Sequence, residues 1–196
     1  MIEYIKGKVE DLSPAQLIME CNGIGYALNI SLTTYSVFNG CKDGKIYVYE
    51  VIREDAHILY GFATREEREL FLLLISVSGV GPNTARMILS SLPPAELIQV
   101  IASGDDVSLT SIKGIGSKTA QRIVIDLRNK VKPVESMGEK GRSLSGERSE
   151  TAEGAVAALV MLGFQKVASQ KVVDSILKKT PAMSVEQVIK DALKML

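Results

Sequence analysis

The chain has 196 residues, 46% of them hydrophobic, and its 23 Lys and Arg balance its 23 Asp and Glu. That length suits one large domain or two to three small ones with packed cores. The apolar runs are too short to cross a membrane, residues 1–10 lack the apolar stretch of a secretion signal, and two cysteines are too few for a disulfide framework. We therefore predict a globular cytoplasmic protein. Its single histidine excludes a histidine-based metal cluster or catalytic triad.

Residues 1–63 are predicted to form a small β-barrel. Five short stretches are rich in β-branched and aromatic residues and largely alternate apolar with polar side chains. These predicted strands cover residues 2–9, 16–21, 26–30, 46–52 and 57–62, with a helical turn near 31–38. The pattern favours a Greek-key barrel of the OB type. Its five basic and eight acidic residues argue against a simple groove for single-stranded nucleic acid.

Residues 64–131 are predicted to form an all-helical domain. Thr64 and Glu67 make a capping box, which opens a helix where the barrel ends. Pro93-Pro94 stops one helix and starts the next, and Asp105-Asp106 opens another. The five predicted helices cover residues 64–77, 84–92, 95–102, 105–112 and 118–131.

Within this domain the sequence repeats itself at an interval of 35 residues. Gly79-Val80-Gly81 and Gly114-Ile115-Gly116 each follow one apolar helical segment and precede another. The same interval pairs Leu74 with Leu109, Val77 with Ile112, Thr84 with Thr119, Ala85 with Ala120, Ile88 with Ile123 and Leu92 with Leu127. Two copies in register indicate a repeated structural unit.

Each repeat is predicted to be a helix that ends at a glycine with positive φ, a tight turn, and a second helix. Pro82 suits the first position of one second helix, and Ser117 suits the N-cap of the other. Val80 and Ile115 would anchor the turns in the core, while unpaired N–H groups at the helix starts face outward. Such a turn can bind a phosphate, and it resembles the helix-hairpin-helix motif of proteins that hold DNA by its backbone.

The glycines have other interpretations. A Gly-hydrophobic-Gly sequence can be only a glycine cap between two helices. A dinucleotide fingerprint needs a preceding strand and a third glycine or alanine where Thr84 stands, and a nucleotide-binding loop needs glycine where Ser117 stands. We therefore predict no ATP site. One such motif does not distinguish a helix cap from a phosphate-binding turn. Two copies in register favour the phosphate-binding turn.

Two further segments follow. Residues 132–149 are rich in Gly, Ser, Glu, Lys and Arg with almost nothing apolar, which predicts a flexible linker. Residues 150–196 contain three predicted helices, at 152–162, 165–179 and from the Ser184 cap to Leu196, separated by Gly163 and Pro181. A bundle of that size is suited to docking a partner.

The four segments together resemble the RuvA family of Holliday junction-binding proteins over the whole chain. The resemblance is carried by Arg53-Glu54-Asp55-Ala56, Leu59-Tyr60-Gly61-Phe62, Gly79-Val80-Gly81-Pro82, Gly114-Ile115-Gly116, Lys118-Thr119-Ala120 and Leu162-Gly163-Phe164. It implies an α+β fold with an OB barrel, tandem helix-hairpin-helix motifs, a linker and a small terminal bundle. It also implies a homotetramer, or two tetramers that sandwich the DNA, around an open and flat four-way junction.

The resemblance assigns roles to particular residues. Glu54 and Asp55 would form an acidic pin at the centre of the junction, although two acids in a turn are otherwise ordinary solvated turn formers. The terminal bundle would bind the hexameric ATPase RuvB, the resolvase RuvC is a further candidate partner, and no cofactor, metal or catalytic residue is implied. The predicted DNA-binding residues are Gly79, Val80, Gly81, Asn83, Thr84, Arg86, Lys113, Gly114, Ile115, Gly116, Lys118, Thr119 and Arg122.

Two points of the assignment are particular to this chain. Many members of the family carry basic residues where this chain has Asn83 and Ser117, so fewer charges would face the DNA. For RuvB docking the predicted stripe is Leu159, Leu162, Val172 and Ile176, and the competing interpretation is that these residues form the bundle core.

Two other functional classes are compatible with this motif, and the first of them is an enzyme. Helix-hairpin-helix glycosylases add a catalytic aspartate in an aromatic-rich pocket, and nucleases add clustered metal-binding carboxylates. The chain has no Trp and only four Phe, and its acids after residue 120 are scattered, so neither enzyme is favoured. A protein-interaction scaffold with purely structural hairpins is the third class.

Overall fold

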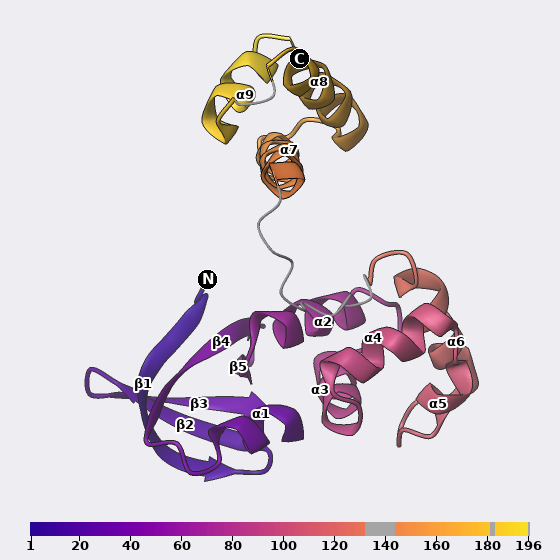
Figure 1. Cartoon of the computed structure of the whole chain (residues 1–196). Coiled ribbons are helices and arrows are strands. Elements are labelled where there is room, and N and C mark those ends of the chain that lie inside the picture. The colour runs from indigo at the N-terminus through magenta and orange to yellow at the C-terminus, as the bar shows by residue number, and fades with distance from the viewer. Residues whose placement is uncertain (132–143, 181–182, 196) are drawn as a thin grey trace. The chain divides into compact units, whose positions relative to one another are not determined.

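The computed structural model describes residues 1–131, 144–180 and 183–195. The chain forms two compact units, residues 1–135 and 136–196. Figure 1 shows the strands and helices α1 to α6 in the first unit and helices α7 to α9 in the second. No helix among the described residues is long and apolar enough to span a membrane.

The N-terminal part of the first unit is a closed five-stranded barrel, as predicted. Its strands are β1 (Tyr4–Ser13), β2 (Gln16–Cys21), β3 (Ile24–Ile30), β4 (Asp43–Ile52) and β5 (His57–Phe62), in the order β1-β2-β3-β5-β4. All neighbours are antiparallel except β3 and β5. The short helix α1 (Leu32–Phe38) connects β3 to β4. β1 runs past the predicted end because a bulge between Val9 and Asp11 breaks the alternation of side chains without ending the strand.

The barrel interior is filled by apolar side chains, and its strands carry glycines where no larger residue would fit. The buried set is Ile5, Leu17, Met19, Leu28, Ile30, Phe38, Ile46 and Val48. A Cβ at Gly61 would lie 2.5 Å from Cδ1 of Ile46, and one at Gly7 would lie 2.0 Å from the Glu20 carbonyl oxygen. Larger residues at these positions would therefore disrupt the closure of the barrel.

The predicted five helices follow the barrel. They are α2 (Arg65–Ile75), α3 (Pro82–Ser91), α4 (Pro94–Ser103), α5 (Asp106–Thr110) and α6 (Ser117–Leu127). Their shared core includes Tyr60 and Phe62 of β5, and the Phe71 ring of α2 lies 5.3 Å and 4.8 Å from those two rings. The barrel and the helical segment, predicted as separate domains, therefore pack as one unit.

Polar contacts fasten the first of these helices, α2, to the barrel. Thr64 caps α2 by accepting from the Glu67 amide, but the Glu67 carboxylate does not return to the Thr64 amide as a full capping box would. It is buried instead, and accepts hydrogen bonds from the Ser31 and Thr34 hydroxyls and the Ala63 amide. Arg68 also pairs with Glu3 at 2.6 Å.

The second unit consists, within its described residues, of α7 (Leu144–Met161), α8 (Lys166–Lys179) and α9 (Val185–Ala192). α7 begins inside the segment predicted to be a linker, whose remainder, 132–143, lies outside the described residues along with Pro181 and Leu196. Gly163, at φ 99°, ends α7 as predicted: its amide bonds to Val160 and the Phe164 amide to Leu159. Ser184 caps α9, which stops at Ala192 instead of reaching the predicted end.

Candidate nucleic-acid interface

The two glycine turns have the same backbone geometry. Gly79 has φ 92° and Gly114 has φ 90°, a conformation that only glycine adopts without strain. The Val80 amide donates to the Val77 carbonyl at 3.0 Å, and the Ile115 amide donates to the Ile112 carbonyl at 3.1 Å. The sequence repeat is therefore a structural repeat, hairpin α2–α3 followed by hairpin α5–α6.

The second glycine of each turn has a different role from the first. Gly81 and Gly116 have φ −87° and −81° and are the N-caps of α3 and α6. Ser117 is thus the first helical residue, equivalent to Pro82, and the prediction that it caps α6 is wrong. The register of the repeat explains this, because the cap position that Gly81 takes in α3 falls on Gly116 in α6.

Both turns leave their amides open to the outside. The N–H groups of all four turn glycines have no acceptor among the described residues. Neither cap is filled by a side chain, and a Cβ built at any of the four would meet no protein atom within 4 Å. Unpaired amides at the positive end of a helix dipole attract anions, and an oxyanion could approach this backbone closely.

The apolar residue between the glycines anchors each turn. Val80 and Ile115 are both 5% exposed and belong to the core of the first unit. Ala85 and Ala120, one turn into α3 and α6, are fully buried. Val80 and Ile115, counted among the predicted DNA-binding residues, therefore hold the turns in place from inside the protein.

The cationic side chains differ sharply between the hairpins. In the second hairpin, Lys113, Lys118 and Arg122 are exposed. In the first, Arg86 is half-buried, and its Nη1 donates to the barrel carbonyls of Ala15 at 3.1 Å and Ile30 at 3.4 Å. Arg86 thus fastens α3 to the barrel and is turned away from the open amides.

Two threonines and an asparagine complete the predicted contact set. Thr84 and Thr119 are half-buried, whereas Asn83 is exposed. The Tyr60 hydroxyl of β5 donates to Oδ1 of Asn83 at 3.3 Å. Burial raises the pKa of Tyr60, with the charges of Arg86 and Arg53 opposing the shift. Tyr60 therefore stays a neutral hydrogen-bond donor and joins β5 to the first hairpin.

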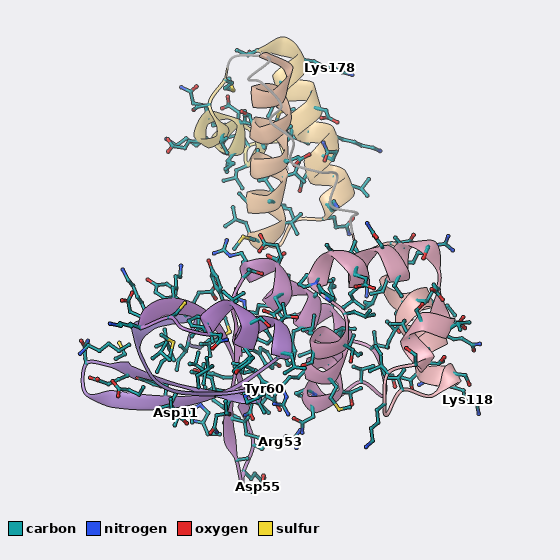
Figure 2. All side chains as sticks on the ribbon, turned by 60° about the horizontal axis from the view of Figure 1, so that its bottom comes forward. Asp11, Arg53, Asp55, Tyr60, Lys118 and Lys178 are labelled. Carbon is teal, nitrogen blue, oxygen red and sulfur yellow. The ribbon has the colours of Figure 1, made fainter. Side chains whose placement is uncertain are left out.

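The predicted acidic pin lies at the tip of the β4–β5 hairpin. Glu54 and Asp55 are exposed there, and the Arg53 amide closes the tip by donating to the Ala56 carbonyl at 2.8 Å. Figure 2 shows Asp55 at the end of a hairpin that projects from the first unit, with Arg53 above it and Tyr60 near its base. Neither acid forms an ion pair within the part of the chain that the structure describes.

A cleft of about 260 Å³ separates this hairpin from the start of α3. Its lining comes from both sides: Val51, Arg53, Ile58 and Tyr60 from the β4–β5 hairpin, and Gly81, Pro82, Asn83 and Thr84 from the first turn and the start of α3. Arg53 and Tyr60 are not among the predicted DNA-binding residues. Both lie in motifs that carry the family resemblance, but nothing in the sequence brings the β4–β5 hairpin next to a turn twenty residues later.

The described residues were also compared with the arrangement that a metal site needs. They contain no group of three or more His, Cys, Asp and Glu that could hold a metal ion. In the second unit, Leu159 and Ile176 of the predicted docking stripe are buried and Val172 packs against the same core, so only Leu162, at 59% exposure, lies on the surface. The exposed apolar residues around it are Val160, Met161 and Val167.

Comparisons with known proteins match all three parts of the chain. The family described as "RuvA N terminal domain" matches residues 1–61, "SAM-like Helix-hairpin-helix tandem" matches 71–129, and "RuvA, C-terminal domain" matches 151–196. A relative from Parabacteroides distasonis is 66% identical over the whole of both chains. Relatives from Bacteroides fragilis and Porphyromonas gingivalis are 56% and 50% identical, again over the whole of both chains. Each is named Holliday junction branch migration complex subunit RuvA, and this chain belongs to the RuvA family.

Proposed function

We propose that this protein binds the Holliday junction as the non-catalytic subunit of a branch-migration complex. The observation that carries the proposal is the pair of equivalent turns, each with open amides at a helix start, in the same compact unit as an acidic hairpin. The names of the relatives supply the substrate.

The two turns would grip phosphates of a DNA arm through backbone amides. A phosphate oxygen at a helix N-terminus is stabilised by direct N–H donors and by the dipole. Such contacts carry no sequence information, which suits a protein that must hold a junction while base pairs move through it. Lys113, Lys118 and Arg122 add charge at the second turn.

The acidic hairpin would act by repulsion. We propose a homotetramer with four-fold symmetry, or two such tetramers enclosing the DNA, in which Glu54 and Asp55 of every subunit meet at the crossover. Carboxylates repel phosphates, most strongly where the DNA excludes water and salt. A continuous duplex crossing that centre would suffer this repulsion, whereas the diverging arms of a junction would pass around it.

The second unit would recruit the motor. Four exposed apolar side chains gather where α7 ends and α8 begins, namely Val160, Met161, Leu162 and Val167. We propose this cluster as the docking site for the RuvB ATPase, since exposed apolar clusters on small domains mark interaction surfaces. It replaces the predicted stripe, of which only Leu162 is retained. RuvC is a further candidate partner of the DNA complex.

The proposal is tested by titrating the full chain against a four-way junction and a linear duplex of the same length. We expect tight, discrete complexes with the junction and at least about tenfold weaker binding to the duplex. Equal affinity for both would contradict junction recognition, and cleavage or base release without a partner would indicate an enzyme instead.

A further inference from the structure

The first hairpin has the backbone of a phosphate grip but no free cation in its turn or on the helix that follows. The repeat interval places Ser78, Asn83 and Met87 where the second hairpin has Lys113, Lys118 and Arg122. The only cation on α3 is Arg86, which bonds to the barrel carbonyls. One of two otherwise equivalent anion sites therefore lacks a free cation on the helix that begins at its turn.

Cations from other elements flank this turn on both sides. Arg122 of α6 reaches across, with its Nη1 3.5 Å from the Ser78 hydroxyl. On the side of the barrel, Arg53 lines the same cleft as Gly81, Asn83 and Thr84. The charge of Arg53 also acts on Tyr60, whose hydroxyl is bonded to Asn83.

The Arg53 side chain is free to take an external partner. It is exposed, and it forms no hydrogen bond or ion pair with any described residue, although Glu54 and Asp55 are adjacent in sequence. Only its backbone amide is used, to close the hairpin. Guanidinium groups match phosphate oxygens in two-pronged geometry, so a phosphate is the anion best suited to it.

We propose that Arg53 binds the DNA phosphate held by the first hairpin turn, and so supplies a cation that the residues of this turn do not carry. The inference rests on the proposed function and names one of its contact residues. A phosphate in this cleft would meet the amides at the start of α3 on one side and the Arg53 guanidinium on the other.

The position of Arg53 makes the contact specific for the crossover. The residues that follow it are the two acids of the tip, so attraction at the cleft and repulsion at the tip act within one short hairpin. A strand that reaches Arg53 must turn before it reaches Glu54 and Asp55. Strands exchanging at a junction do so, whereas a straight duplex strand does not.

The test measures binding of a four-way junction and a linear duplex to the full chain, across a series of salt concentrations. We expect Arg53→Gln to weaken junction binding at least about tenfold, the value of one lost charge-assisted contact. The slope of log affinity against log salt should fall by about 0.9 for each arginine–phosphate contact removed. The duplex should respond much less, and Arg128→Gln, an exposed arginine on the same unit outside the cleft, should change neither.

A second variant tests whether Arg53 acts through its positive charge or in another way. Asn83→Lys places a cation on the first turn itself, where the repeat has Lys118, so Arg53→Gln combined with Asn83→Lys should recover most of the lost affinity. Unchanged junction affinity and salt slope in Arg53→Gln would overturn the proposal. So would a change of oligomeric state measured by light scattering, because Arg53 would then be a subunit contact. If the unaltered protein does not prefer the junction, the proposed function itself has failed.

Discussion

The two helix hairpins have one backbone and two different surroundings. Their turns share φ values, hydrogen bonds and a buried apolar anchor. The first is fastened to the barrel through Glu67, Arg86 and Asn83, and the second carries the exposed cations. The two turns thus keep the same backbone geometry of an anion site, whereas the residues around each turn determine which cations lie next to it.

Placing aspartate at the first glycine of a turn should have the largest effect. Gly114→Asp forces a side chain into a left-handed conformation, at a cost of about 1–2 kcal/mol. It also adds a negative charge beside the open amides, so junction affinity should fall by more than about tenfold while circular dichroism retains the helix content. Gly79→Asp should do the same if both turns bind phosphate. A folded Gly114→Asp protein with normal junction affinity would make the turn purely structural.

Substitution of the second glycine of each turn is a matched comparison for substitution of the first. Gly81→Ala and Gly116→Ala place a methyl group at negative φ, where nothing in the protein lies within 4 Å of it. Thermal unfolding should therefore change little, whereas junction affinity should fall severalfold if the phosphate approaches the backbone closely. Affinity unchanged from the parent protein would mean that the DNA remains at a distance from these amides.

Glu67 tests how the first hairpin is held. Glu67→Ala removes the buried acceptor of three hydrogen bonds and should reduce the free energy of unfolding by about 1–3 kcal/mol, measured by urea titration. Burial raises the pKa of Glu67 above 4.5, despite the opposing hydrogen bonds from Ser31 and Thr34. Folding therefore favours the protonated carboxyl. The stability that comes from the raised pKa is complete below pH 4.5 and is lost as the pH rises through the folded-state pKa.

Glu67→Gln isolates that pH dependence. The difference in unfolding free energy between the parent protein and Glu67→Gln should change only above pH 4.5. Arg68 lowers the pKa of Glu3 and Ser108 lowers the pKa of Asp105. These two carboxyls therefore change the unfolding free energy only below the ordinary carboxyl pKa, and they do so equally in both proteins. A constant difference across pH 4 to 8 would mean that Glu67 has an ordinary pKa.

Most of the fold could be predicted from the sequence because local signals agreed with tertiary packing. Strand alternation, the Thr64 cap and the 35-residue repeat each had a physical counterpart in the structure. Ser117 was misplaced because a serine before a helix is a common cap, and only the register of the repeat reveals that Gly116 takes the position. The docking stripe was chosen by helical spacing, which marks the buried face as readily as an exposed one.

The side-chain environment of the site was beyond local reasoning. Arg86 has the spacing of a phosphate ligand, yet the barrel carbonyls that it meets belong to strand β3 and the turn before β2. Tyr60 and Arg53 join the site only because the β4–β5 hairpin lies beside the start of α3. Each depends on a contact between segments far apart in the chain, which periodicity and capping rules do not encode.

The acidic hairpin should have a smaller effect on affinity than either turn, and a larger one on choice of substrate. Glu54→Gln combined with Asp55→Asn removes two charges per subunit from an exposed tip, so the fold should be unaffected. Repulsion acts mainly on a duplex crossing the centre, so binding to linear duplex should tighten a few-fold more than binding to the junction. Equal gains on both substrates across salt concentrations would mean that these acids are only solvated turn residues.

Removing the second unit should have the smallest effect on DNA binding. Both hairpins, the cleft and the acidic tip lie in the unit that ends near residue 135, and the core of that unit contains no residue from α7 to α9. A chain ending at residue 131 should therefore bind the junction with unchanged affinity but fail to stimulate the RuvB ATPase. Leu162→Asp in the full chain is the matched variant: because Leu162 is exposed, the bundle should stay folded, and only stimulation of RuvB should be lost. Loss of junction binding on truncation would show that the hairpins do not act alone, and normal stimulation by Leu162→Asp would move the docking site elsewhere on the bundle.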